Sequence, residues 1–160
     1  MTRRKGTKPE EFAGVYQSYS EIPTRHRLET YAEQYRDEDT WHRYCSEILF
    51  EEFDSQHIRD SARKAGQSWL AHMDDRDSHH ALATPDDADT WSQKLLNGRK
   101  RRTCYEQYFV RIYQFYDHLK KSYQHPHLYN PLLIAAINYE TTRHLWRYRV
   151  DSRPEVRSRD

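Results

Sequence analysis

Four consecutive cations followed by a threonine form the segment of this sequence best suited to binding chemistry. The run consists of Arg99, Lys100, Arg101 and Arg102, with Thr103 next as the expected N-cap of a helix. Guanidinium groups and the free N–H groups of a helix start both suit phosphate oxygens. Arg111, two turns further on, would extend this track along a duplex. We interpret 99–103 as a phosphate-binding turn, with a solvated basic loop that binds nothing as the alternative.

Ten histidines and two cysteines are the other candidates for chemistry. The His79-His80 and His125-Pro-His127 pairs lack the spacing of known metal motifs, so we interpret them as surface loops and predict no metal site. Cys45 lies in an apolar helical stripe and is expected in the core. Cys104 stands beside arginines that would lower its pKa, although a buried packing role is favoured.

Catalysis is not expected from this sequence. No local spacing brings together a nucleophile, a base and an orienting group, and only four glycines argue against a nucleotide-cradling loop. We therefore predict that the protein is not an enzyme and uses no cofactor.

Charge is strongly segregated along the chain, although the net charge is only +1. Residues 28–60 hold ten acids against three arginines, and residues 74–89 hold six aspartates against one arginine. The segment 94–121 reverses this balance, with eight cations against two acids. Such asymmetry indicates a charged partner.

These charges must be positioned by helices, because apolar residues recur with helical spacing almost throughout. The predicted helices cover 11–20, 28–35, 39–53, 58–73, 84–96, 103–124 and 131–146. A cap followed by proline marks two starts, at Thr84-Pro85 and Asn130-Pro131, and Gly98 favours a left-handed helix end. Three aspartates in the first turns of the 84–96 helix would stabilise the positive end of its dipole; they are Asp86, Asp87 and Asp89.

The expected fold class is therefore all-α, a small helical bundle of about five to seven helices. Thirteen tyrosines and four tryptophans fill the apolar stripes, and we expect them to build the core. We divide the chain into a basic flexible N-terminus (1–10), N-terminal helices (11–75), a second helical unit (76–148) and a flexible C-terminal tail (149–160). The 11–75 helices belong either to the same bundle or to a small separate unit.

The cellular setting is expected to be the cytoplasm. No stretch of the sequence has the length of apolar residues that a membrane span needs, and the N-terminus lacks the apolar core of a signal peptide. Two cysteines cannot form a disulfide framework, which favours a reducing compartment.

The second half of the sequence resembles the N-terminal core-binding domain of tyrosine recombinases, the phage-integrase family. The resemblance covers 84–137 and rests on the Pro-Asp helix from Thr84, the basic turn into Thr103, the stripe from Tyr108 to Leu119, and the closing Asn130-Pro131 pair. The acid-rich flanking segments are similar to those of archaeal members. The family's catalytic domain is missing, and we attribute the His144-x-x-Arg147 spacing to chance.

This resemblance implies a non-catalytic protein that grips double-stranded DNA of the attachment-site type. It places Arg99, Lys100, Arg101, Arg102 and Thr103 at the DNA-facing turn, with Arg111 as a weaker candidate on the same helix. Self-association or a recombinase catalytic subunit would be further partners. The alternative function is a helical protein–protein interaction module that pairs acidic and basic faces without nucleic acid.

Overall fold

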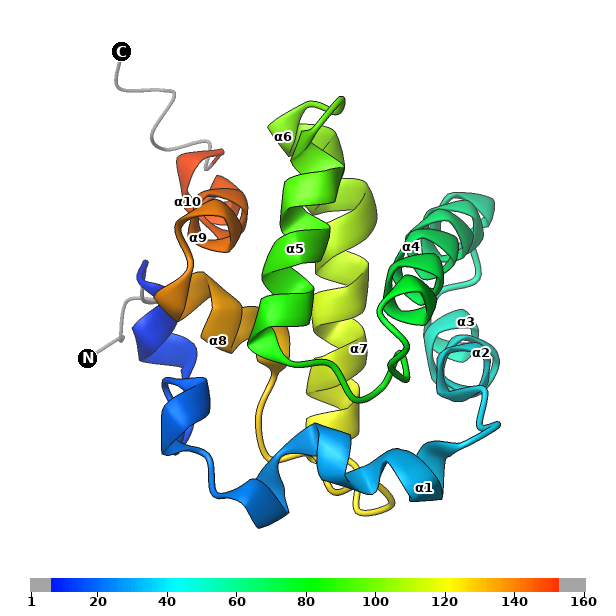
Figure 1. Ribbon diagram of the computed structural model, residues 1–160. Coiled ribbons are helices and arrows are strands. Elements are labelled where there is room, and N and C mark those ends of the chain that lie inside the picture. Colours follow the sequence, from blue (N-terminus) through cyan, green and yellow to red (C-terminus); the bar gives the residue numbers. More distant parts are fainter. Residues whose placement is uncertain (1–6, 153–160) are drawn as a thin grey trace, which may run out of the picture.

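The computed structural model describes residues 7–152, and these residues form helices and connecting loops with no strand (Figure 1). The α-helices are α1 (Ala32–Tyr35), α2 (Thr40–Tyr44), α3 (Phe50–Glu52), α4 (Gln56–Asp75), α5 (Pro85–Leu96), α6 (Arg101–Thr103), α7 (Val110–Lys121), α8 (Pro131–Asn138), α9 (Glu140–Trp146) and α10 (Tyr148–Asp151). The predicted all-α bundle is confirmed.

Two of these helices continue through a π-helical segment into the next. The segment η5 (Cys45–Leu49) joins α2 to α3, and η6 (Cys104–Phe109) joins α6 to α7. Each segment begins at a buried cysteine. The chain from Arg101 to Lys121 is therefore one continuous helical run, in which the widened turn is packed against α4.

The N-terminal region is less helical than predicted. The expected helix over 11–20 is wrong, because this region contains only the 3₁₀ turns η1 (Pro9–Phe12) and η2 (Tyr19–Glu21) with extended chain between them. Val15, within this region, is 83% exposed. Two further 3₁₀ turns, η3 (Thr24–His26) and η4 (Leu28–Tyr31), lead into α1. Residues 1–6 and 153–160, parts of the predicted tails, lie outside the described residues, whereas Tyr148–Asp151 is helical.

Helix boundaries elsewhere follow local signals. Thr84 and Asp87 form a reciprocal capping box, with Thr84 Oγ1 accepting from Asp87 N–H at 3.1 Å and Asp87 Oδ2 accepting from Thr84 N–H at 2.9 Å. Asn130 caps α8, and Gly98 ends the α5 region with φ +114°. The predicted 131–146 helix is interrupted at Tyr139, whose backbone is extended (φ −120°, ψ 132°).

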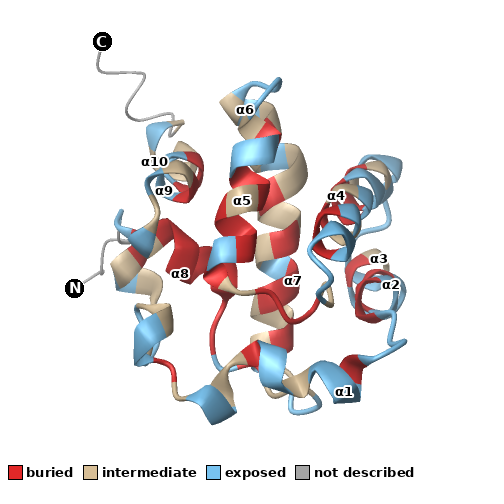
Figure 2. Ribbon diagram, viewed as in Figure 1, coloured by how far each residue is buried: buried red, intermediate tan, exposed pale blue. Residues whose placement is uncertain are grey.

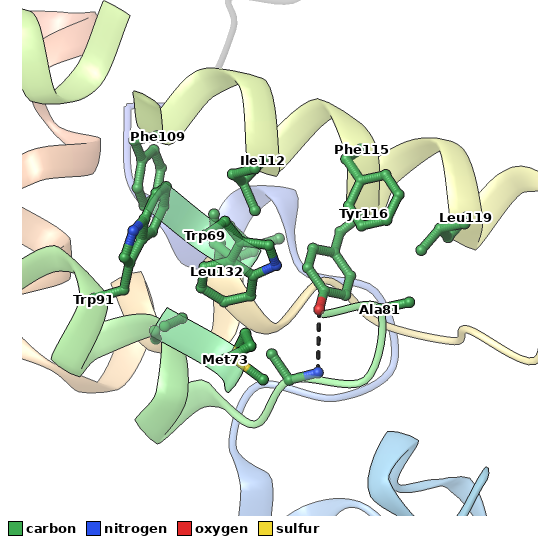
Figure 3. Packing of buried hydrophobic residues seen from close by; sticks show 14 of the residues in the cluster. Trp69, Met73, Ala81, Trp91, Phe109, Ile112, Phe115, Tyr116, Leu119 and Leu132 are labelled. Atoms are coloured by element: carbon green, nitrogen blue, oxygen red, sulfur yellow. Dashed lines mark hydrogen bonds between the residues drawn. The ribbon is translucent and has the colours of Figure 1, made fainter. Parts of the chain in front are cut away.

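One hydrophobic core joins the two halves of the chain (Figure 2). Trp69 of α4 and Trp91 of α5 meet edge to face with ring centroids 4.9 Å apart, beside Tyr116 of α7 (Figure 3). The Tyr116 hydroxyl accepts from Ala83 N–H at 3.1 Å and donates to the His80 carbonyl at 2.7 Å, so it also holds the loop before α5. Leu28, from the N-terminal helices, is fully buried in the same cluster.

Helix α8 runs through this core because its sequence is apolar on every side. Its first six residues are all buried (Figure 2). The partners on either side are α5 and α9.

Candidate functional site

The α5–α6 turn presents the basic segment at one end of the bundle, beside α9 and α10 (Figure 1). Lys100 is the N-cap of α6 and has extended backbone (φ −70°, ψ 147°). No side chain caps this helix start. The first intrahelical bond runs from Cys104 N–H to the Lys100 carbonyl at 3.0 Å, so the N–H groups of residues 101–103 precede the helical ladder and have no acceptor within the helix.

The predicted role of Thr103 as the N-cap is wrong. Thr103 already has helical backbone angles (φ −63°, ψ −44°), and the helix begins two residues earlier at Arg101. The cause is the preceding chain: the φ of +114° at Gly98 reverses the direction of the backbone, and the helix starts as soon as Lys100 has completed the turn.

The four cations of the turn have different surroundings. Arg101 is held within the fold: its Nε donates to the His144 carbonyl at 3.0 Å and its Nη2 pairs with Asp151 at 2.7 Å. Arg102 pairs with Glu106 one helical turn on, at 3.1 Å, and both side chains are exposed. Arg101 therefore acts as a structural tie between α6 and the α9–α10 junction.

Arg99 and Lys100 are the accessible cations of the turn. Both are exposed, and within residues 7–152 no carboxylate forms an ion pair with either of them. The Arg99 guanidinium lies over the Tyr108 ring, 4.8 Å from its centroid, which orients the side chain while leaving its N–H edges free. Tyr108 was not among the predicted site residues, because its contact with Arg99 depends on the turn geometry.

Arg111 does not join this group. It lies ten residues into the helical run, roughly 15 Å from Arg101 along the axis. Its Nε donates to Ser61 Oγ on α4 at 3.2 Å, and burial lowers the pKa of the guanidinium. The structure thus separates Arg111 from the turn and gives it a packing partner.

Both cysteines are buried core residues, as favoured from the sequence. Cys104 is fully buried and its Sγ donates to the Leu95 carbonyl at 3.1 Å. Burial raises the pKa of the Cys104 thiol despite the nearby Arg99, so the lowered pKa expected from neighbouring arginines is wrong. Burial also raises the pKa of Cys45 to about 12.

The two histidine pairs lie in loops, as predicted, and form one layer of aromatic contacts around Tyr35. His79, His80 and His125 are half-buried, and the surface interpretation is wrong for the buried His127. His127 is 2% exposed; its Nε2 bonds the Ala81 carbonyl at 2.6 Å, and its Nδ1 has no hydrogen-bond partner among the described residues. His80 Nε2 accepts from Trp41 N–H at 3.1 Å, in the first turn of α2. Burial lowers the pKa of each of these two imidazoles to about 4.

Metal binding is not supported by this layer. Among residues 7–152, no group of three or more His, Cys, Asp or Glu side chains is arranged to hold a metal ion. The Tyr35 hydroxyl lies 2.5 Å from His125 Nδ1, so one ring nitrogen of that pair is already engaged. Through the contacts of His125 with Tyr35 and of His80 with Trp41, the layer connects α1 and α2 to the two histidine loops.

An acidic cleft lies at the other end of α4 and α5 from the basic turn. Its volume is about 850 Å³, and its carboxylates come from α1, from the end of α4 and from the turns that follow these two helices; they are Glu33, Asp37, Asp74 and Asp77. The one arginine of the lining, Arg36, pairs with Glu33 at 2.6 Å. The charge segregation of the sequence thus becomes a separation in space.

Comparison with protein-family models, with curated proteins and with solved structures finds no match to this chain. In the part of the chain that the structure describes, no helix combines the length and apolarity needed to cross a bilayer.

Proposed function

We propose that this protein is a non-catalytic DNA-binding protein that contacts the phosphates of a duplex through the α5–α6 turn. The observation that carries the proposal is the position of Arg99 and Lys100. They are exposed, lack carboxylate partners in the described chain, and directly precede a helix start whose N–H groups have no side-chain cap.

The chemistry of the turn matches a phosphate group. Arg99 offers a planar guanidinium fork, Lys100 offers an ammonium group, and the helix start adds backbone donors and the positive end of a helix dipole. Arg102 is a further donor because its exposed pair with Glu106 is exchangeable in water. Contacts of this kind position a protein on DNA without reading its sequence.

The resemblance to the core-binding domain of tyrosine recombinases supports the same function. The segments on which the resemblance is based form these elements, in order along the chain: a capped helix from Thr84–Pro85, the basic turn, the long helical run, and a second capped start at Asn130–Pro131. On this proposal, double-stranded DNA of the attachment-site type is the partner.

The test is a fluorescence-anisotropy titration of a short duplex with the wild-type chain, with R99Q/K100Q and with the matched control K120Q/K121Q. The control removes the same charge at the C-terminal end of α7, and no carboxylate of the described chain pairs with Lys120 or Lys121. Arg101 is left unchanged because it ties α6 to α9.

Wild type is expected to bind with an affinity that falls steeply between about 50 and 200 mM salt. R99Q/K100Q should bind more weakly and lose about 1.8 from the slope of log affinity against log salt, since each phosphate contact contributes about 0.9. K120Q/K121Q should match wild type. Equal behaviour of the two double variants, or no binding by wild type, would contradict the proposal.

The alternative function, a protein–protein interaction module, is favoured by one observation. The acidic cleft and the basic turn lie at opposite ends of α5, so a second copy could dock its turn into the cleft. Light scattering across a salt series distinguishes the two: self-association that disappears at high salt, without duplex binding, would favour the module.

A further inference from the structure

A second basic surface lies on α9, the helix whose His144 carbonyl Arg101 contacts. It is a cleft of about 510 Å³ between the chain before η1 and the face of α9–α10 that carries residues 143, 147 and 150. Three cations line it, Lys8, Arg143 and Arg147, against one carboxylate, Glu10. The cleft is thus positively charged.

All three of its cations are exposed, and two of them have no side-chain partner within residues 7–152. Lys8 and Arg147 are exposed, and within residues 7–152 neither side chain forms a hydrogen bond or an ion pair. Arg143 is anchored: its Nε donates to the Ala136 carbonyl at 3.1 Å and its Nη2 donates to the Ile137 carbonyl. Because Arg143 and Arg147 are four residues apart on one helical face, their charges act on the same ligand.

The walls of this cleft are fixed by aromatic packing. The Arg149 guanidinium lies between Phe12 of η1 and Trp146 of α9, 4.5 Å and 4.6 Å from the two ring centroids. Phe12 also meets Trp146 edge to face at 5.5 Å. The segment carrying Lys8 is therefore held against the helix that carries Arg147, and little reorganisation is needed to bind an anion.

The helix that carries the cleft and the helical run from the α5–α6 turn are joined by several contacts. Arg101 bonds the His144 carbonyl and Asp151, while Tyr148 OH donates to Glu106 at 3.3 Å, so α9–α10 and the helical run from Arg101 are joined at several points. In Figure 1, α9 and α10 lie beside α6, so the helix that carries Arg143 is a neighbour of the start of the helical run.

We infer that the cleft lined by Lys8, Arg143 and Arg147 is a second phosphate-binding surface for the same nucleic acid backbone. This inference rests on the proposed function, because a polyphosphate chain is the ligand that meets both surfaces at once. A free anion would occupy only one of them. The spacing held by Arg101 then sets which phosphates of a duplex are contacted together.

The test compares K8Q/R147Q with R99Q/K100Q and K120Q/K121Q on the same duplex and salt series. K8Q/R147Q is expected to weaken binding and to lower the salt slope by about 1.8, as two phosphate contacts require. A quadruple variant of both surfaces should lower the slope by about twice that amount.

The outcomes separate the inference from the proposed function. Normal binding by K8Q/R147Q with weak binding by R99Q/K100Q overturns the inference alone. Weak binding by K8Q/R147Q with normal binding by R99Q/K100Q supports the cleft and overturns the proposed role of the turn. No binding by wild type overturns both.

Melting temperature distinguishes a purely structural role of Arg147 from a role in binding. Arg147 follows the C-terminal end of α9, where a cation stabilises the helix dipole. A lower melting temperature of K8Q/R147Q with unchanged affinity would assign Arg147 to helix stability and overturn the inference.

Discussion

Asp89 of α5 caps helix α9, although Thr142 lies 53 residues further along the chain. Asp89 Oδ1 accepts hydrogen bonds from Thr142 N–H at 3.2 Å and from Thr142 Oγ1 at 2.6 Å, and both residues are buried. From the sequence, Asp89 was expected to stabilise the N-terminal end of its own helix, α5. Instead, its carboxylate fixes the start of α9, the helix that carries the further basic cleft.

Replacing Asp89 is therefore expected to destabilise the fold. In Asp89→Ala the buried Thr142 N–H loses its acceptor and the Thr142 hydroxyl keeps only Ser92 Oγ, at 3.2 Å, which costs roughly 2–4 kcal/mol of the free energy of unfolding. Asp89→Asn keeps one carbonyl oxygen and should cost less. Urea unfolding measures both, and an unchanged midpoint for Asp89→Ala would contradict the capping role.

Gly66 inside α4 is required by a tertiary contact. A Cβ at this position would lie 2.1 Å from Trp41 Nε1, and Trp41 is itself packed against Phe115 at 5.2 Å. Gly66→Ala should lower stability by about 1–3 kcal/mol, although alanine favours a helix by about 1 kcal/mol. Gly14→Ala is the control, because nothing lies within 4 Å of its Cβ. A stabilised Gly66→Ala would show that Trp41 moves freely.

Acidification is expected to destabilise the protein through the buried histidines. The pKa values of His80 and His127 are lowered to about 4 from the ordinary 6.5, so each stabilises the fold fully above pH 6.5. That contribution, up to about 3 kcal/mol per histidine, is lost as the pH falls from 6.5 through 4, because the unfolded chain takes up the proton first.

The variant His80→Gln isolates one of these histidines. Its amide oxygen can accept from Trp41 N–H without titrating, so the loss of stability between pH 7 and pH 4 should be smaller than in wild type. Urea unfolding at a series of pH values gives the comparison. A wild-type pH dependence in His80→Gln would assign the acid sensitivity to other groups.

The cysteine thiols are expected to resist modification in the native protein. Cys45 is 5% exposed and Cys104 is fully buried, and burial raises the pKa of both. A thiol reagent at pH 8 should react with both residues only after denaturant unfolds the chain. Rapid reaction of either thiol without denaturant would show that its π-helical segment opens in the native state.

Local signals in the sequence determined most helix positions. The Thr84–Asp87 capping box, the Asn130 cap and the reversal at Gly98 act over a few residues, so their chemistry is visible in the sequence. The apolar spacing likewise predicted the four buried tryptophans, whereas only four of the thirteen tyrosines are buried and Tyr123 is exposed. Even the location of the basic segment, at a turn between two helices, follows from these short-range rules.

Only the tertiary structure decided which charges remain accessible and where the helices break. Arg101 looked equivalent to Arg99 in the sequence, yet its partners lie 43 and 50 residues away. The break at Tyr139, the space that Gly66 leaves for Trp41 and the burial of His127 likewise depend on packing between distant segments. Composition and periodicity do not record such contacts, because they form only when the whole bundle has assembled.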